Sequence, residues 1–161
     1  MRFRRSRGPA SPTDGLEFDI AFPEELEVTR DLAGYDLTIS TGDPGDARAT
    51  TISVGALRDA AGPLTLDDHV AGVRAALAGA DLSRRLVDEG PAAVAGHEAW
   101  WTIESAVADG PAFVVERWLF VRDGVGWTVN VQMPWSALHQ VRDGALAIVA
   151  TLRFRDDEAA A

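Results

Sequence analysis

Four consecutive segments between residues 82 and 133 have the patterns of strands joined by tight turns, and they constrain the fold more than any other part of the chain. Asp109-Gly110 and Asp123-Gly124 are dipeptides favoured in two-residue hairpin loops. Strands joined by hairpins pair antiparallel, so the sheet is expected to be largely antiparallel. The predicted strands are Leu82 to Glu89, turned by Gly90-Pro91, then Glu98 to Val107, Phe113 to Arg122 and Trp127 to Met133, which Pro134 ends.

The last of these strands has the clearest alternation and predicts one face of the core. Trp127, Val129, Val131 and Met133 alternate with polar residues, as in a strand with one buried side. A slip of one residue would bury the polar set instead, so this register is strongly specified. We therefore predict that Trp127 is a core residue.

Three earlier strands and two helices complete the predicted elements. The strands are Leu16 to Phe22 before Pro23, a second around Leu37 and Ile39, and Thr50 to Leu57. One helix begins after the N-cap Thr65, with Asp68 placed for a capping box, and ends near Gly79. The other runs from about Ser136 to Val149. This β-β-β-α-β-β-β-β-α order is an α+β fold with six to seven strands, and we expect both helices on one face with the other face partly open.

Length and local composition predict one domain with short flanking segments. The chain has 161 residues, which is about the size of one domain. Residues 1–15 are basic and rich in Ser, Pro and Gly, and we predict a disordered leader there. The predicted domain covers residues 16–154, and residues 155–161 are predicted to be a disordered acidic, Ala-rich tail.

Charge and composition exclude several classes of partner. The formal net charge is −10, which disfavours nucleic acid and anionic membranes as main partners. No apolar run approaches the roughly 18–20 residues of a membrane span. Cys is absent, and no apolar signal region follows the N-terminal arginines, so we expect a cytoplasmic protein. All 15 basic residues are Arg, which together with abundant Ala is typical of GC-rich, for example actinobacterial, coding sequences.

The residues of common catalytic and metal sites do not form a recognisable pattern. His69, His97 and His139 are scattered without metal-ligand spacing, and no Gly-x-Ser-x-Gly or Gly-x-Gly-x-x-Gly motif occurs. Glu104 and Glu116 are predicted to face each other across the Asp109-Gly110 hairpin, where an acid–base pair is one interpretation and two solvated carboxylates the other. We predict no enzymatic activity, no cofactor and no metal.

Tryptophan provides the candidate binding surface. All five Trp lie between Trp100 and Trp135, and two of them, Trp100 and Trp118, share strand parity with polar residues. Large aromatics among polar groups are enriched at binding surfaces. Alternatively, a helix or the leader covers them, or a bulge shifts the parity. If Trp118 and Glu116 face outward, Arg117 lies between the apolar Val115 and Leu119 on the inner face and needs a partner or an edge position there. The predicted binding residues are Trp100, Thr102, Glu104, Glu116, Trp118 and Asn130.

Several short motifs in a fixed order resemble the Mog/PsbP-like α/β/α sandwich superfamily, nearest to the bacterial LpqN/LpqT and DcrB-like families. The motifs are the opening Phe18 to Pro23, the helix entry Leu64 to His69, Gly96-His97-Glu98-Ala99, the Asp123-Gly124 hairpin and the closing Leu152-Arg153-Phe154. The resemblance implies a non-enzymatic binding or accessory role, because no shared catalytic residues define these families. The usual layering of the superfamily would also cover more of the sheet than two helices on one face do.

Together these patterns predict a non-enzymatic cytoplasmic binding or adaptor protein that uses an open sheet face with exposed aromatics. A protein is the expected partner, with its identity open and a homodimer as one possibility. Two alternatives stay open: a chaperone-like adaptor for a secretion effector, and a small-molecule-binding sensor.

Overall fold

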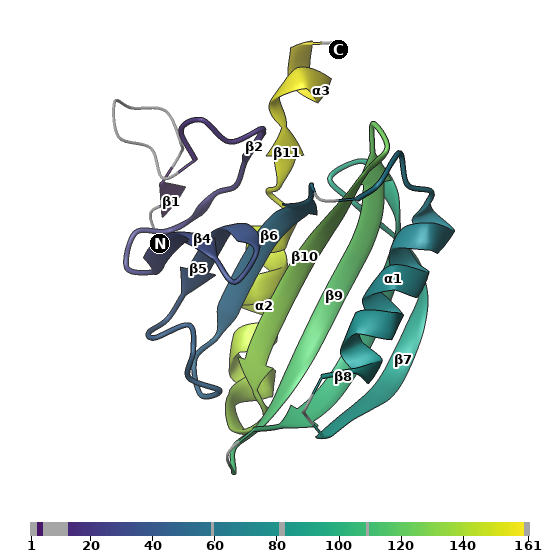
Figure 1. The fold of residues 1–161 in the computed structure, drawn as a ribbon. Helices are drawn as coiled ribbons and strands as arrows, with labels where there is room; N and C mark the ends of the chain where they lie inside the picture. Colours follow the sequence, from purple (N-terminus) through teal and green to yellow (C-terminus); the bar gives the residue numbers. More distant parts are fainter. Residues whose placement is uncertain (1–2, 5–12, 59, 81–82, 109, 160–161) are drawn as a thin grey trace.

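The computed structural model describes residues 3–4, 13–58, 60–80, 83–108 and 110–159. Within them, a seven-stranded antiparallel sheet has the strand order β4-β5-β6-β10-β9-β8-β7 (Figure 1). Its strands are β4 (Glu27–Leu32), β5 (Tyr35–Ser40), β6 (Thr51–Leu57), β7 (Ser83–Val94), β8 (His97–Val107), β9 (Ala112–Arg122) and β10 (Val125–Pro134). Two small pairs join β1 (Phe3–Arg4) with β3 (Phe22–Pro23), and β2 (Phe18–Asp19) with β11 (Arg153–Phe154). The predicted α+β class and antiparallel sheet are confirmed.

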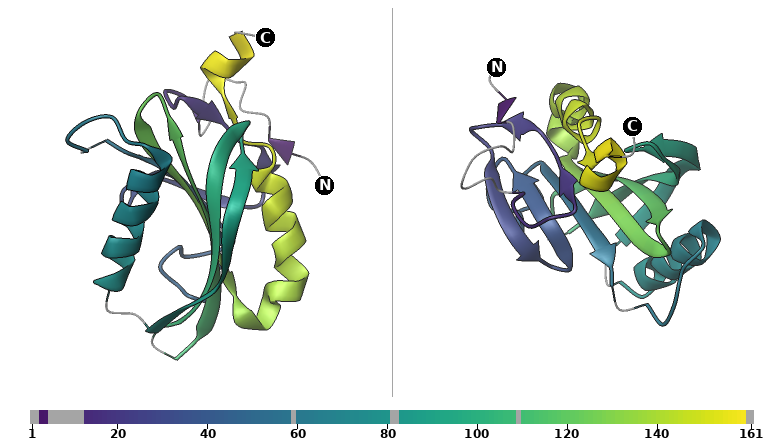
Figure 2. Two further views of the ribbon diagram at one scale, coloured as in Figure 1. Left: turned by 90° about the vertical axis from the view of Figure 1, so that its right-hand side faces the viewer. Right: turned by 90° about the horizontal axis from the view of Figure 1, so that it is seen from above.

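The two long helices lie on opposite faces of this sheet, so the expectation that they share one face is wrong. Helix α1 (Leu66–Ala78) packs against β8 and β9, whereas α2 (Leu138–Val149), which follows the 3-10 turn η1 (Trp135–Ala137), packs against β10. Figure 2 shows the sheet between them. Of the two long helices, only α2 packs against the apolar side of β10, because α1 crosses the other face between β6 and the far edge strand β7.

Helix α1 begins and ends where the sequence predicts. The Thr65 side chain accepts a hydrogen bond from the Asp68 backbone N–H, the Asp68 carboxylate accepts from the Thr65 backbone, and Gly79 is the C-cap. The helix approaches the sheet closely at Gly126, where a Cβ would lie 2.6 Å from His69 Nδ1. A side chain at position 126 would therefore push α1 away from β10.

The alternating segment Leu16 to Phe22 was predicted to be the first strand, but it does not belong to the main sheet. Phe18, Ile20 and Phe22 are buried in the core, but their segment forms only the short strands β2 and β3 at the side. The sheet instead begins with the β4–β5 hairpin, which turns at Ala33-Gly34 with φ of 52° and 86°. Strand β4 is exposed and mostly polar, so periodicity gave no signal for it.

The predicted turn at Gly90-Pro91 is also wrong, because β7 continues through both residues to Val94. Since β7 is an edge strand, the missing N–H of Pro91 is tolerated there. The chain turns instead at Ala95-Gly96, with positive φ at both residues, as it does at the correctly predicted Asp123-Gly124. These turns set the pairing of β7 with β8 and of β9 with β10.

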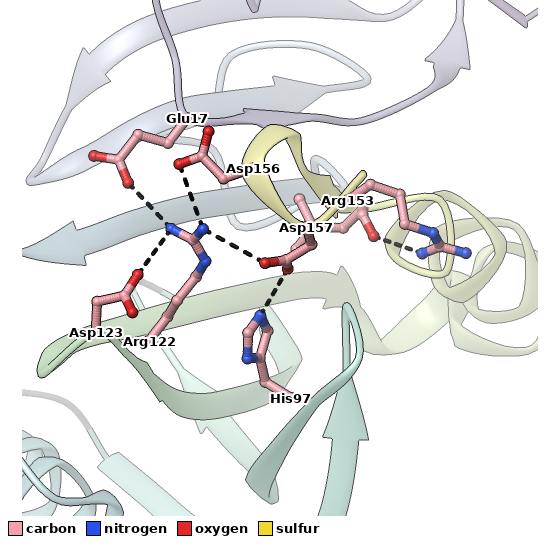
Figure 3. A network of polar contacts seen from close by, with 8 residues as sticks. Glu17, His97, Arg122, Asp123, Arg153, Asp156 and Asp157 are labelled. Carbon is pink, nitrogen blue, oxygen red and sulfur yellow. Dashed lines mark hydrogen bonds and ion pairs between the residues drawn. The ribbon is translucent and has the colours of Figure 1, made fainter. Parts of the chain in front are cut away.

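Arg122 connects the ends of the described chain to the sheet (Figure 3). Its guanidinium lies 3.4–3.8 Å from carboxylate oxygens of Glu17, Asp123, Asp156 and Asp157. Asp157 belongs to the short helix α3 (Arg155–Ala159), within the segment that we predicted to be a tail. Of the predicted leader, residues 1–2 and 5–12 lie outside the described residues, and so do 160–161 of the tail. The boundaries at 16 and 154 stay a prediction.

Candidate functional site

The six predicted binding residues lie on two faces of the sheet, so they do not form one surface. The β8–β9 register places Trp101 opposite Trp118 and Trp100 opposite Leu119. Trp100, Thr102 and Glu104 consequently face α1, and Glu116 and Trp118 face α2. Asn130 lies in register with Arg117, which is opposite Thr102, so it shares the α1 face. The predicted facing of Glu104 and Glu116 is wrong, because Ile103 stands opposite Glu116.

The α1 face is a polar layer that crosses the sheet. One row of directly paired residues runs through five strands, with Thr102, Arg117, Asn130, Ser53 and Thr38 in order. The Thr38 and Ser53 hydroxyls lie 3.0 Å apart and share a hydrogen bond. Four of these five residues are buried, and Asn130 is half-buried. Polar side chains buried in such numbers on a sheet face are unusual for a purely structural core.

Glu104 links two arginines at the centre of this layer. Its two carboxylate oxygens accept hydrogen bonds from Arg84 Nη1 of β7 and Arg117 Nη1 of β9, each at 3.0 Å. Glu104 and Arg117 are buried, and Arg84 is half-buried. The partner that Arg117 needs on the apolar parity of β9 is therefore the predicted site residue Glu104.

Tyr35, at the start of β5, is within the electrostatic influence of the same two arginines. A Cβ on Gly55 would lie 2.8 Å from the Tyr35 Cα, so only glycine at position 55 lets β5 bend this closely over β6. Burial raises the pKa of Tyr35, and the positive charges of Arg117 and Arg84 oppose that shift. The phenol is thus neutral at physiological pH.

A cleft of about 390 Å³ opens beside this layer, between the second half of α1 and strands β7 and β8. The first half of α1 is anchored by the buried His69 and Val70, whereas Ala75 and Ala76 are exposed. The cleft is lined by Arg74, Leu77, Ala78, Ala80, Arg84, Leu86, Glu89, Thr102 and Glu104. It therefore contains two of the six predicted residues.

Trp100 supports one wall of the cleft without lining it. Its Nε1–H donates to Glu89 Oε2 at 2.9 Å, and Arg74 binds the same carboxylate while its guanidinium lies 5.9 Å from the Trp100 ring centroid. The Trp100 and Arg74 hydrogen bonds lower the pKa of Glu89. Glu89 is therefore held as an anion, and the aromatic ring is half-buried rather than free.

Two buried polar atoms among the residues that line the cleft have no hydrogen-bond partner in the described part of the chain. They are Arg84 Nε, a donor, and Thr102 Oγ1, which can donate or accept. Asn130 Oδ1, further along the polar row, is also unpartnered there. Because an unmade buried hydrogen bond costs about 1–3 kcal/mol, such atoms call for a specific explanation.

Glu116 organises the α2 face of the same strands. It is 1% exposed, accepts a hydrogen bond from Trp101 Nε1 at 3.1 Å, and is bound by Arg142 of α2 through two nitrogens. Trp118 packs partly buried against the main core, and Trp101 is half-buried. These contacts join α2 to the sheet, so Glu116 and Trp118 have structural partners.

The three histidines lie apart, and no group of three His, Asp or Glu side chains in the described residues is placed to hold a metal. His139 is exposed, and His97 lies 3.2 Å from Asp157. His69 is buried, and its Nε2–H donates to the Trp127 carbonyl at 2.9 Å. Its Nδ1 has no partner in the described residues. Burial lowers the pKa of His69, and the bond to Trp127 opposes that shift.

We expect His69 to make the fold less stable in mild acid. Because its folded pKa lies below the unfolded value of about 6.5, its contribution is present above that pH. It is lost as the pH falls toward the folded pKa, with a slope of at most about 1.4 kcal/mol per pH unit. Urea unfolding of the parent and His69→Gln between about pH 7.5 and 5 measures this. A parallel pH dependence in both proteins would contradict the prediction.

Solved structures with the same fold include proteins from three bacteria. Cyanobacterial PsbP (CyanoP) of Synechocystis sp. PCC 6803 aligns with a TM-score of 0.59 and 11% identity over 94% of this chain and 92% of that one. PA94 of Pseudomonas aeruginosa, a protein of unknown function, gives 0.57 and 11% over 94% and 96%. LpqN of Mycobacterium tuberculosis, involved in cell envelope biogenesis, gives 0.56 and 16% over 94% and 90%.

These likenesses concern the fold. No protein-family model and no curated protein matches the sequence. The predicted PsbP-like fold, related to that of LpqN, is confirmed. None of the three proteins is named as an enzyme. In the described residues, no helix has the length and apolar composition needed to cross a membrane.

Proposed function

We propose that this protein is a non-enzymatic binding module whose ligand occupies the cleft between α1, β7 and β8. The observation that carries the proposal is the pair of unpartnered buried atoms, Arg84 Nε and Thr102 Oγ1, on residues that line that cleft. Binding sites typically combine apolar walls with a few placed polar groups. Leu77 and Leu86 provide such walls, and Leu86 is 50% exposed.

The chemistry of the lining defines the class of ligand. Arg84 Nε can only donate, so it requires an oxygen or nitrogen acceptor, whereas the Thr102 hydroxyl can donate or accept. The lining charges balance, since Arg74 and Arg84 are paired with Glu89 and Glu104. The cleft therefore favours a compact organic ligand without strong net charge, with a carbonyl or hydroxyl oxygen and an apolar part.

The ionisable groups of the cleft support binding rather than catalysis. Each carboxylate already accepts hydrogen bonds from arginine or tryptophan N–H groups, and Glu89 is held as an anion, which removes it as a general acid. Glu104 is engaged by two arginines, one on each carboxylate oxygen. The cytoplasmic location stays a prediction.

We expect Thr102→Val to leave the stability unchanged or raise it by about 1 kcal/mol, because it removes a buried hydroxyl that makes no hydrogen bond. Substitution of a residue that serves binding at a cost in stability often stabilises the fold in this way. Urea unfolding is the measurement, with Thr128→Val on the same face, outside the cleft, as the matched control. A loss of about 1 kcal/mol at Thr102 alone would mean that the hydroxyl is bonded within the protein.

Thermal-shift screening tests the site itself. Amino acids with uncharged side chains and their N-acetyl amides are the probes, because each has the required oxygen and an apolar part without net charge. A ligand that binds only the folded state raises the melting temperature. We expect the shift in the parent and in Thr128→Val, and a loss of it in Thr102→Val and Arg84→Met. A shift that survives both cleft substitutions, or none with any probe, contradicts the proposed site.

A further inference from the structure

The most exposed aromatic side chain in the described residues lies away from the cleft. Trp135 is 58% exposed and stands in the 3-10 turn η1, directly after β10 ends at Pro134. This end of the sheet, where α2 begins, is at the bottom of Figure 1, and the C-terminal segment is at the top. Val107, at the end of β8, is also exposed, at 46%. An apolar ring this exposed is typical of contact surfaces.

Two hollows border Trp135. Their volumes are about 280 Å³ and 370 Å³, and Trp135 and Ala112 line both. The smaller is completed by Ser83, Arg85, Ser105, Ala106 and Val107, and the larger by Ala47, Arg48, Pro111, Pro134, Ser136 and Ala137. The walls are mainly apolar, so each hollow suits an apolar side chain.

The charge around Trp135 is opposite to that of the whole chain. The protein has a net charge of −10, but the charged residues lining the hollows are the two cations Arg85 and Arg48, with no Asp or Glu. Arg48 has only a weak contact with Asp46, at 3.9 Å, and its side chain is 76% exposed. Arg85 is exposed and makes no hydrogen bond or ion pair with the described residues. Both guanidiniums are available to a carboxylate.

We propose that Trp135 and its two hollows dock a short linear segment of a partner protein that carries an acidic side chain beside apolar ones. The segment lies across the indole, with one apolar side chain in each hollow and its carboxylate on Arg85. Charge complementarity selects an acidic segment, and the two hollows select apolar neighbours. This surface is separate from the cleft at α1, so it does not depend on the ligand proposed there.

A protein segment fits this surface better than a lipid surface does. A bilayer presents many anionic headgroups to a whole face of this acidic chain, which opposes its approach, whereas a single carboxylate on a docked segment is influenced mainly by the adjacent Arg85 and Arg48. The indole also borders two separate hollows, whereas membrane-anchoring aromatics stand on a continuous apolar face.

Selection of random linear peptides displayed on phage against the full chain tests the proposal. We expect enriched peptides to share an Asp or Glu next to aliphatic or aromatic residues. Binding of the synthetic peptides, measured by fluorescence anisotropy, is expected to weaken at least tenfold in Trp135→Ala. Arg85→Gln is expected to weaken it about twofold to fivefold. Ala112→Phe, which fills space in both hollows and keeps Trp135, is expected to block binding.

Arg153→Gln is the matched control, since it removes the same charge from an exposed arginine in β11, at the other end of the molecule. It is expected to bind like the parent, and far-ultraviolet circular dichroism checks the folding of every variant. No enriched peptide, or peptides that bind Trp135→Ala as tightly as the parent, overturns the proposal. Binding to phosphatidylserine vesicles that Trp135→Ala abolishes would assign the surface to membranes and overturn it as well.

Discussion

Trp127→Ala is expected to lower the free energy of unfolding by about 3–5 kcal/mol, the range for large aromatic residues truncated in cores. Trp127 is 2% exposed and lies at the centre of an aromatic cluster. Its ring centroid is 4.9 Å from that of Phe154, 5.9 Å from Phe18 and 6.4 Å from Phe120. Phe18 and Phe154 belong to the short β2–β11 pair, so the substitution also loosens both ends of the domain from the sheet.

Urea unfolding of Trp127→Ala beside Trp135→Ala measures this effect. Trp135 is the matched control because it is the same residue type at an exposed position, where substitutions usually change stability by about 0.5 kcal/mol or less. Equal losses in the two variants would contradict the burial of Trp127.

The core was predictable because it depends on one alternation in one strand. Trp127, Val129, Val131 and Met133 are all buried, and they pack with the α2 residues Ala145, Ile148 and Val149. Helix α1 was predictable from its capping box. In both cases the signal is local, since strand periodicity and helix caps depend on residues within one element.

The facing of Trp118 was mispredicted although the sequence contained the information to place it. The tight turns that the sequence predicts at Asp109-Gly110 and Asp123-Gly124 specify the registers of β8–β9 and β9–β10. They place Trp118 opposite Trp101 on one side and opposite Val129 on the other. Since Val129 was assigned to the core, Trp118 and Glu116 had to share its face. The prediction took the side of β9 that contains Glu116 as the exposed side because Glu116 is charged. It was wrong because Glu116 is buried and is bound by Trp101 and Arg142.

The cleft was beyond local reasoning, because it depends on how α1 packs over the β7–β8 hairpin. The pairing of β7 with β8 places Arg84 near Glu104, but only the packing of α1 brings Arg74 to the same cleft. One signal was present: Arg117 on an apolar parity required a carboxylate nearby. The β8–β9 register places Thr102 directly opposite Arg117. Glu104, two residues further along the same face of β8, is therefore within reach of the Arg117 side chain.

Glu104→Ala is expected to cost about 3–5 kcal/mol of stability, as removal of one member of a buried ion-pair network does. Glu104 bonds Arg84 and Arg117, and Arg117 is only 5% exposed. Without the carboxylate, the buried Arg117 and the half-buried Arg84 lose their counter-ion, and the nearby Tyr35 stays neutral and cannot replace it. Glu98→Ala, an exposed position of the same parity on β8, is the control and should stay within about 0.5 kcal/mol.

A combined variant separates the cost of an unpaired charge from any net stabilisation by the network. Arg84→Met, Glu104→Leu and Arg117→Met together replace the three charges by apolar groups of similar size, which in other proteins is often neutral or stabilising. We expect this triple variant to recover most of the stability lost in Glu104→Ala, as measured by urea unfolding. It should also lose the ligand-induced rise in melting temperature, because Arg84 Nε is gone from the cleft. If the triple variant is instead as unstable as Glu104→Ala, the network is a net source of stability, and its polar character needs no ligand to explain it.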